Sequence, residues 1–432
     1  MQPKMRRILL VIEQCNPEWP SVPLVGYNYY KEISKLAHVT LVTHERNKEN
    51  LESIHPDEDI VYIPESKFVK RYYKIAENAS KIGDKLIWPI YNTLEYPVYG
   101  EFNNLVYKKF RAPVLRGDYD IVHAITPMMP RYPVKLIKAC HSVPFIIGPV
   151  NGGVPFPKAF QSIANQEFSY FNFLRLVGRY IIPGYRETYK KADCILAGST
   201  FTFDLIRDLF SIENNKIKLF YENGVKSSFV RSDKEFIDFT TRDKDTINLL
   251  FVGRLVPYKG AKFLIEAISK LRKSVLEKIV LTIVGDGSER HQLELQVKSF
   301  NLDDKVIFAG WVKQKDTLQY YADSDVFCFP SVREFGGAVV LEAMSSGLPC
   351  IVVNNGGIGE YVTDGTGFRI DPVSEEYIVE NLKISIDKLV SDSSLRRKMG
   401  LNALQRVREF TWPKKAEKIV DIYEYSLQSR NT

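Results

Sequence analysis

The stretch that decides the fold is residues 331–360, SVREFGGAVVLEAMSSGLPCIVVNNGGIGE. It follows an apolar run, Val326 to Phe329, which has the length and the β-branched and aromatic content of a buried strand. A short helical pattern starts after Gly336 and Gly337, and Gly347 stands where a left-handed residue would end it. Cys350 to Val353 then reads as the next buried strand, so the stretch predicts strand, glycine loop, helix and strand.

Such an arrangement favours binding of an anion. Glycines let the backbone approach a phosphate, and the N–H groups and dipole of a helix N-terminus favour negative charge. Glu334 lies in the predicted loop and Glu342 in the helix, with seven residues between them. Two carboxylates repel a phosphate but accept hydrogen bonds from vicinal hydroxyls, which suits a sugar joined to a nucleotide. The alternative is structural: glycines that make a turn, and a glutamate that complements a helix dipole.

The stretch resembles the signature of retaining GT-B glycosyltransferases of family 4, in which two glutamates seven residues apart precede Ala-Met, a glycine and a proline. The resemblance implies that Glu334 contacts the donor sugar and Glu342 the ribose of the nucleotide. It places further donor-binding residues at Phe335, Gly336, Gly337, Ala338 and Val339. The order here is Glu, Phe, Gly, Gly, whereas the family has a small residue before the aromatic one.

A second motif follows the predicted strand Leu249 to Val252. Gly253 and Arg254 come directly after it, and Lys259 opens a helical pattern. Relatives use this arginine and lysine to hold the donor pyrophosphate. The chemistry agrees, because a leaving diphosphate gains negative charge that two fixed cations stabilise without a metal. We therefore expect Arg254, Lys259 and Glu334 to be catalytic.

Two further turns in the second half match the family pattern. Asp286 stands between two glycines after the predicted strand Leu281 to Val284, where a plain turn is the alternative. The segment after the predicted strand Val306 to Ala309 corresponds to the one whose backbone reads the nucleobase in relatives, and it contains Gly310, Trp311 and Val312.

In the first half, short apolar runs such as Ile8 to Ile12 and Val39 to Thr43 alternate with helical patterns. This alternation predicts a parallel, doubly wound α/β sheet, whose ligands lie beyond the carboxyl ends of the strands. Gly26, which we place in a loop before a helix, is a candidate donor contact. By resemblance, His123 at the end of the strand Tyr119 to Ala124 bonds the donor sugar, with a satisfied structural histidine as the alternative.

The length of 432 residues suits two domains. We expect residues 1–235 to form a Rossmann-like acceptor domain and residues 236–411 a Rossmann-like donor domain, facing a cleft. Residues 412–432 are expected as a helix that returns to the first domain. The charged stretch Lys226 to Asp245 reads as a linker.

Composition narrows the partners and the compartment. The net charge of +7, with 26% charged residues, suits an anionic ligand without requiring nucleic acid. No run approaches the ~20 apolar residues of a membrane span. Five scattered cysteines indicate a reduced cytoplasmic setting without a metal site.

Two segments interleave aromatic with basic residues, Lys67 to Arg116 and Phe156 to Lys191. One interpretation is peripheral contact with the anionic inner face of a membrane, and the favoured alternative is core packing.

The sequence thus predicts a metal-independent enzyme without a cofactor that moves a sugar from a nucleoside diphosphate donor to a hydroxyl acceptor, with retention. The acceptor expected by resemblance is a saccharide or lipid-linked saccharide of cell-surface polysaccharide synthesis. The resemblance also implies a front-face displacement in which the leaving phosphate takes the acceptor proton. A nucleotide-sugar epimerase of the same fold and a non-catalytic sugar-nucleotide binding protein remain as alternatives, whereas the missing Gly-x-Gly-x-x-Gly after the first strand argues against an NAD enzyme.

Overall fold

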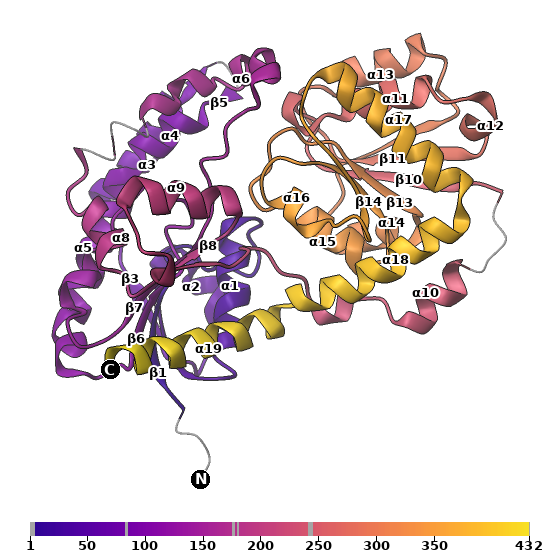
Figure 1. Cartoon of the computed structure of the whole chain (residues 1–432). Helices are drawn as coiled ribbons and strands as arrows, with labels where there is room; N and C mark the ends of the chain where they lie inside the picture. Colours follow the sequence, from indigo (N-terminus) through magenta and orange to yellow (C-terminus); the bar gives the residue numbers. More distant parts are fainter. Residues whose placement is uncertain (1–4, 83–84, 175–177, 179–180, 241–244, 432) are drawn as a thin grey trace. The chain divides into compact units, whose positions relative to one another are not determined.

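The computed structural model describes residues 5–82, 85–174, 178, 181–240 and 245–431. The chain divides into two compact units (Figure 1). Unit 1 comprises Met1–Gly153, Glu167–Glu222 and Trp412–Thr432, and unit 2 comprises Val154–Gln166 and Asn223–Thr411. None of the helices within the described ranges combines the length and the apolarity that a membrane span requires.

Unit 1 is built on a seven-stranded sheet in the order β3-β2-β1-β6-β7-β8-β9, with parallel pairing throughout. Its strands are β1 (Arg7–Val11), β2 (His38–His44), β3 (Ile60–Ile63), β6 (Ile121–Ala124), β7 (Phe145–Val150), β8 (Cys194–Ala197) and β9 (Ile217–Leu219). A separate antiparallel pair joins β4 (Lys81–Ile82) to β5 (Lys85–Leu86). Its helices include α1 (Val22–Ile33), α2 (Lys48–Glu52), α3 (Lys67–Ala79), α4 (Trp88–Leu94), α5 (Tyr96–Arg116), α8 (Tyr185–Lys191), α9 (Thr200–Phe210) and α19 (Trp412–Asn431).

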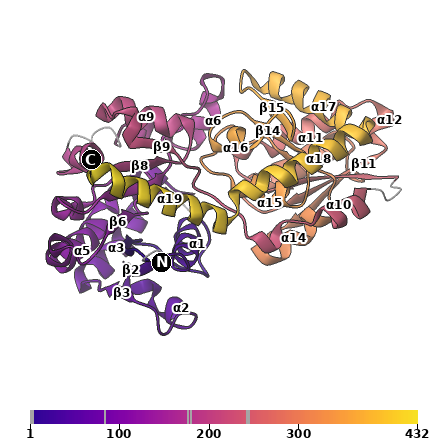
Figure 2. The same cartoon turned by 60° about the horizontal axis from the view of Figure 1, so that its bottom comes forward.

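Both faces of this sheet are covered, as a doubly wound fold requires. Alternate residues of β1 point to opposite faces: Leu9 packs in a cluster that includes α5, and Leu10 in one that includes α1 and α19. Helix α19 lies beside α1 in both views (Figures 1 and 2), and the rings of Tyr29 and Trp412 meet edge to face with centroids 5.1 Å apart.

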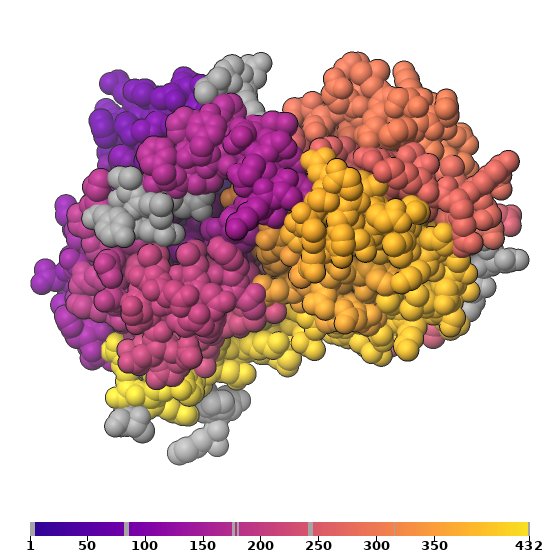
Figure 3. Space-filling view, turned by 45° about the horizontal axis from the view of Figure 1, so that its top comes forward, coloured from indigo at the N-terminus to yellow at the C-terminus, as the bar shows by residue number. Residues whose placement is uncertain are grey.

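Unit 2 is built on a six-stranded parallel sheet in the order β12-β11-β10-β13-β14-β15. Its strands are β10 (Ile247–Val252), β11 (Ile279–Val284), β12 (Val306–Gly310), β13 (Val326–Phe329), β14 (Cys350–Val353) and β15 (Gly367–Ile370). Its helices include α6 (Gln161–Gln166), α10 (Asp233–Thr240), α11 (Ala261–Ser269), α12 (Lys273–Leu276), α13 (Arg290–Ser299), α14 (Gln314–Asp323), α15 (Ala338–Ser345), α16 (Gly357–Tyr361), α17 (Glu375–Ser391) and α18 (Ser393–Val407). Helices α17 and α18 contribute to the outer surface of unit 2, amber and yellow in Figure 3.

The decisive stretch folds as its pattern predicts. Strands β13 and β14 have the predicted bounds, and α15 begins directly after Gly337. Gly347 is left-handed, with φ at 78°, so the predicted helix end is confirmed. Strands β3 and β15 had no expectation attached to them.

The linker expected between residues 226 and 245 is wrong for the described part of that range. Helix α10 lies there, and Phe236 is only 2% exposed within unit 2. Ser232 and Glu235 cap the helix reciprocally, since the Glu235 N–H donates to Ser232 Oγ and the Ser232 N–H to the Glu235 carboxylate, 3.2 and 2.9 Å away. The change of unit at this point falls between Glu222 and Asn223, and Val154–Gln166 also groups with unit 2.

The two segments that mix aromatic and basic residues divide between core and surface. Tyr99, Phe102 and Tyr185 are buried, whereas Trp88 and Tyr170 are about half exposed, at 51% and 55%. Arg175, Arg179 and Tyr180 of the second segment lie outside the described residues. Core packing is confirmed for the buried aromatic residues, and contact with a membrane stays a prediction.

Candidate functional site

The candidate site of unit 2 lies where the strand order reverses. Strand β10 is flanked by β11 on one side and β13 on the other, so the connections after β10 and β13 leave the sheet in opposite directions. Ligands of open parallel sheets bind at the carboxyl ends of such strands. The loops that follow these two strands carry Arg254, Lys259 and Glu334, as the sequence predicts.

The two loops are bound to each other by backbone contacts. The Val332 N–H donates to the Tyr258 carbonyl over 2.9 Å, and Ser331 Oγ donates to the same oxygen over 3.2 Å. Gly260 is left-handed, with φ at 72°, and a Cβ there would lie 2.3 Å from the Pro330 carbonyl oxygen. Only glycine permits this close approach, which brings the loops after β10 and β13 together.

Lys259 and Glu334 meet directly. The lysine Nζ donates to Glu334 Oε2, and the two side chains are only 12% and 16% exposed. Lys259 also lies over the ring of Phe329, 5.0 Å from its centroid. The predicted diphosphate ligand and the predicted sugar ligand are therefore paired to one another in this structure, and a ligand diphosphate would have to share the lysine.

Arg254 remains open to solvent beside this pair. Its side chain is exposed, and its Nη2 donates to the Tyr258 hydroxyl over 2.8 Å. Tyr258 directly precedes Lys259, so one tyrosine connects the two cations expected at the pyrophosphate. Gly253, before Arg254, packs against Phe329, since a Cβ there would lie 3.2 Å from the ring.

The loop that carries Glu334 has a constrained backbone. Glu334 forms a parallel β-bridge with Gly356, and the Gly357 N–H donates to the Phe335 carbonyl over 3.0 Å. Gly337 is left-handed, and a Cβ there would lie 2.1 Å from Ile358 Cγ2. Helix α15 therefore starts beside Glu334, with Gly336 buried in the loop and Ala338 and Val339 in the first turn, where helix N–H groups lack intrahelical partners.

Glu342 occupies a second position on α15, against α14. Its Oε1 accepts a hydrogen bond from Gln314 Nε2 over 3.1 Å, and its Oε2 accepts one from the Tyr321 hydroxyl over 3.0 Å. Burial raises the pKa of the Glu342 carboxyl, while the bonds from Gln314 and Tyr321 oppose that rise. The carboxylate is thus held in place by donors that the sequence analysis did not identify.

The remaining predicted donor residues lie on the loops after β11 and β12. Asp286 caps its own turn, since its Oδ1 accepts the Gly287 N–H over 2.7 Å. The Gly310 carbonyl accepts the Gly285 N–H over 2.8 Å, which ties the two loops together. Trp311 is 71% exposed, and Val312 beside it is half-buried.

Two expectations in unit 1 need correction. His123 is 0% exposed, and its ring nitrogens each lie 2.7 Å from an oxygen, Nδ1 from the Tyr423 hydroxyl and Nε2 from the Gly148 carbonyl. Its surroundings are those of a core histidine, which contradicts the expected contact with a sugar. Gly26 lies inside α1 and not in a loop, because a Cβ there would come within 2.7 Å of the Gln14 carbonyl oxygen.

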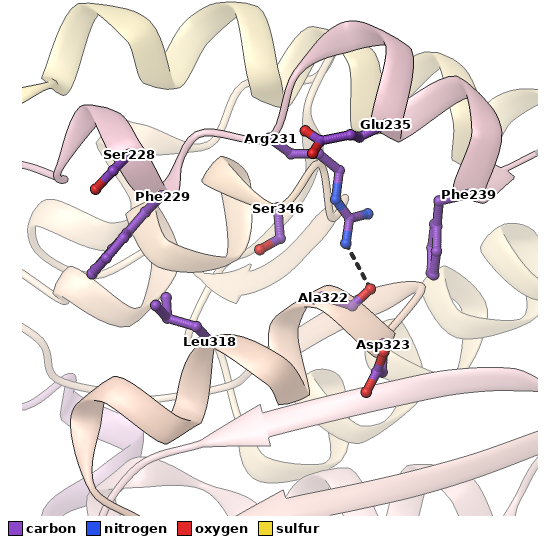
Figure 4. A pocket seen from close by; sticks show the side chains of 9 residues that line it. All are labelled: Ser228, Phe229, Arg231, Glu235, Phe239, Leu318, Ala322, Asp323 and Ser346. Carbon is purple, nitrogen blue, oxygen red and sulfur yellow. Dashed lines mark hydrogen bonds between the residues drawn. The ribbon is translucent and has the colours of Figure 1, made fainter.

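Unit 2 also has a pocket of about 420 Å³ beside α10 and α14 (Figure 4). Arg231 crosses it and donates from Nη2 to the Ala322 carbonyl over 2.6 Å. The lining residues are Ser228, Phe229, Arg231, Glu235, Phe239, Leu318, Ala322, Asp323 and Ser346, none of which the sequence analysis assigns to the donor. Within the described ranges there is no cluster of three or more His, Cys, Asp or Glu that could hold a metal ion.

Comparison with known proteins agrees with this site. Residues 232–406 match the family described as glycosyl transferases group 1. An uncharacterized glycosyltransferase of Methanocaldococcus jannaschii is 29% identical over 252 residues, which cover 56% of this chain and 63% of that protein. LpsE of Rhizobium meliloti, a lipopolysaccharide core biosynthesis glycosyltransferase, is 29% identical over 245 residues, which cover 56% of this chain and 66% of that protein. The chain thus matches just under two thirds of each relative's length.

Solved structures resemble the whole chain. A glycosyltransferase of Rickettsia africae aligns with a TM-score of 0.62 at 16% identity, covering 98% of this chain and 99% of the other. HepE of Anabaena, solved in complex with UDP, aligns with a TM-score of 0.61 at 15% identity, covering 98% and 100%. Identity this low shows the fold alone, which is GT-B with one parallel α/β sheet in each unit.

Proposed function

We propose, on the premise that residues 232–406 belong to the glycosyl transferases group 1, that this protein transfers a sugar from a nucleoside diphosphate donor to a hydroxyl group. One observation carries the proposal. The Lys259–Glu334 pair lies beside the start of α15, whose second carboxylate, Glu342, is held by two hydrogen-bond donors. Cations, helix N–H groups and hydroxyl acceptors thus occupy one sheet edge.

The proposed chemistry centres on the leaving diphosphate. As the glycosidic bond breaks, charge develops on the phosphate oxygens, and Arg254, Lys259 and the first turn of α15 stabilise it. Lys259 moves part of its interaction from Glu334 to the phosphate, which frees the Glu334 carboxylate to accept a sugar hydroxyl. Glu342 accepts the ribose hydroxyls.

We assign retention of the anomeric configuration and independence from metal as parts of this proposal. Two cations at the diphosphate supply the charge that a divalent metal would otherwise supply. The leaving phosphate takes the acceptor proton while the acceptor attacks from the same face, so every bond broken is matched by one formed. The acceptor we propose is a saccharide or lipid-linked saccharide, a class supported by the printed role of LpsE in lipopolysaccharide core synthesis.

The experiment begins with a thermal-shift screen of the wild type against UDP-, GDP- and ADP-sugars, because a bound donor raises stability by RT ln(1 + [L]/Kd). Glu342→Ala should weaken binding of the selected donor and of its free nucleotide at least tenfold. Glu334→Ala should lower transfer by about 10- to 100-fold and spare affinity for the free nucleotide. Glu266→Ala, which removes a surface carboxylate paired with Lys270, is the matched control.

The same assay separates the alternatives. Isomerisation of the donor without an acceptor would indicate an epimerase. Binding without transfer or donor hydrolysis would indicate a sugar-nucleotide binding protein. Equal, negligible effects of both glutamate variants would refute the assignment of the site.

A further inference from the structure

Residues 154–166 leave unit 1 after β7 and pack entirely as part of unit 2. Phe160 is 0% exposed, and its ring meets Phe263 of α11 edge to face with centroids 6.0 Å apart. Ile163 and Ala164 are each 1% exposed. This burial anchors the far end of the segment, so its first residues, 154–156, are held at a fixed place in unit 2.

Those first residues contact the loop that carries Glu334. Arg333 Nε donates to the Val154 carbonyl over 2.8 Å. Asn355 Nδ2 lies 3.3 Å from the Pro155 carbonyl and 2.7 Å from the Val332 carbonyl, so it bridges the segment and the loop. Two consecutive carbonyls of the segment therefore accept hydrogen bonds from residues that flank Glu334 and Gly356.

Aromatic contacts reinforce these bonds. The Arg333 guanidinium lies 4.8 Å from the ring centroid of Phe156 and 4.9 Å from that of Phe335. A guanidinium near the faces of two rings gains cation–π attraction, which a lysine in its place reproduces only in part. Phe156 also meets Tyr258 edge to face at 6.4 Å, and Tyr258 accepts the bond from Arg254.

We propose that Arg333 is a positioning residue, which clamps the Glu334 loop to residues 154–156 and so sets where the Glu334 carboxylate meets the donor sugar. The inference rests on the proposed function and concerns the sugar-reading half of that site. Arg333 and Phe335 flank Glu334 in sequence, and both take part in the clamp. Glu342 has its own donors on α14, so the nucleotide-reading half is independent of it.

The test compares variants of the full chain. Arg333→Met should lower kcat for transfer by about 10- to 100-fold, because small misplacements of positioning groups have effects of this size. Affinity for the free nucleoside diphosphate should change less than about threefold. Phe156→Leu should act in the same direction, and Phe156→Tyr, which keeps the ring, should restore the rate. Arg272→Met, which removes a surface arginine paired with Asp387, is the matched control.

Hydrogen exchange of the amides of residues 331–337 gives a readout that needs no turnover. Exchange should accelerate in Arg333→Met relative to the wild type and to Arg272→Met. Unchanged exchange, unchanged kcat, or an equal loss of nucleotide affinity and transfer would overturn the inference. If the wild type neither transfers nor hydrolyses any donor, the proposed function fails, whereas the exchange comparison still decides whether the clamp orders the loop.

Discussion

The carboxyl edges of the two sheets treat polar side chains in opposite ways. In unit 2, the loops after β10 and β12 leave Arg254 and Trp311 exposed, and the Lys259–Glu334 pair stays partly accessible. In unit 1, Glu13, just beyond β1, and His44 and His123, near the ends of β2 and β6, are only 8%, 2% and 0% exposed. One fold type thus places polar residues at strand ends both as a candidate site and as core.

Burial has a measurable consequence in unit 1. It raises the pKa of Glu13 to about 8, and it lowers the pKa of His44 to about 3 and that of His123 to about 4. Helix α19 adds Lys415, whose pKa burial lowers to about 7. These shifts favour the uncharged forms. The comparison teaches that a polar residue at a strand end indicates a site only when its surroundings leave it a charge and an open side.

The largest effect that would test this contrast is expected at Lys259. Lys259→Met should lower transfer by about 100-fold or more, because it removes a cation from the developing phosphate charge. Stability should fall by no more than about 1 kcal/mol, since Glu334 keeps some solvent contact. Steady-state kinetics and denaturant unfolding measure the two effects, with Lys262→Met of the Lys262–Glu375 pair as control. Intact turnover would place the diphosphate elsewhere.

The reverse pattern is expected at His123. His123→Ala should lower the free energy of unfolding by about 2 kcal/mol, because the Tyr423 hydroxyl and the Gly148 carbonyl lose their buried partner. The ratio of affinities for the nucleotide sugar and the free nucleotide should stay unchanged. Urea unfolding and calorimetric titration test this, and His141→Ala, at an exposed position, is the control. A selective loss of sugar-dependent affinity would restore His123 to the site.

The smallest expected effect concerns Glu13 and depends on pH. Since the folded-state pKa is raised to about 8, the folded state holds the proton, and the contribution of Glu13 to stability falls as pH rises from about 4.5 toward 8. Glu13→Gln cannot ionise, so it should gain about 1 kcal/mol over the wild type at pH 8 and almost nothing at pH 5. Unfolding curves at both pH values, with exposed Glu18→Gln as control, measure this. A difference independent of pH would contradict the burial of a neutral carboxyl.

Much of unit 2 could be predicted because its signals are local. The apolar runs of β13 and β14 and the left-handed Gly347 follow from residues a few positions apart. The missed helix α10 also had a local signal, the Ser232–Glu235 capping box before Phe236.

Other features had no such signal. Glu342 depends on Gln314 and Tyr321, 28 and 21 positions away, and nothing near Glu342 in sequence indicates them. The grouping of residues 154–166 with unit 2 depends on Phe160 meeting Phe263 and on Arg333 reaching Val154, 179 positions away.

The sequence by itself determined the parallel α/β class, the glycine loops and the spacing of the two glutamates, because backbone preference and hydrophobic period are properties of neighbouring residues. Only the tertiary structure decided which strand-end residues keep a charge. His123 became a core group because Tyr423, 300 positions further on, packs against it, and Lys259 became half of an ion pair because two loops meet across the reversal in strand order. Burial and partnership depend on contacts between distant segments, and these form only when the chain folds.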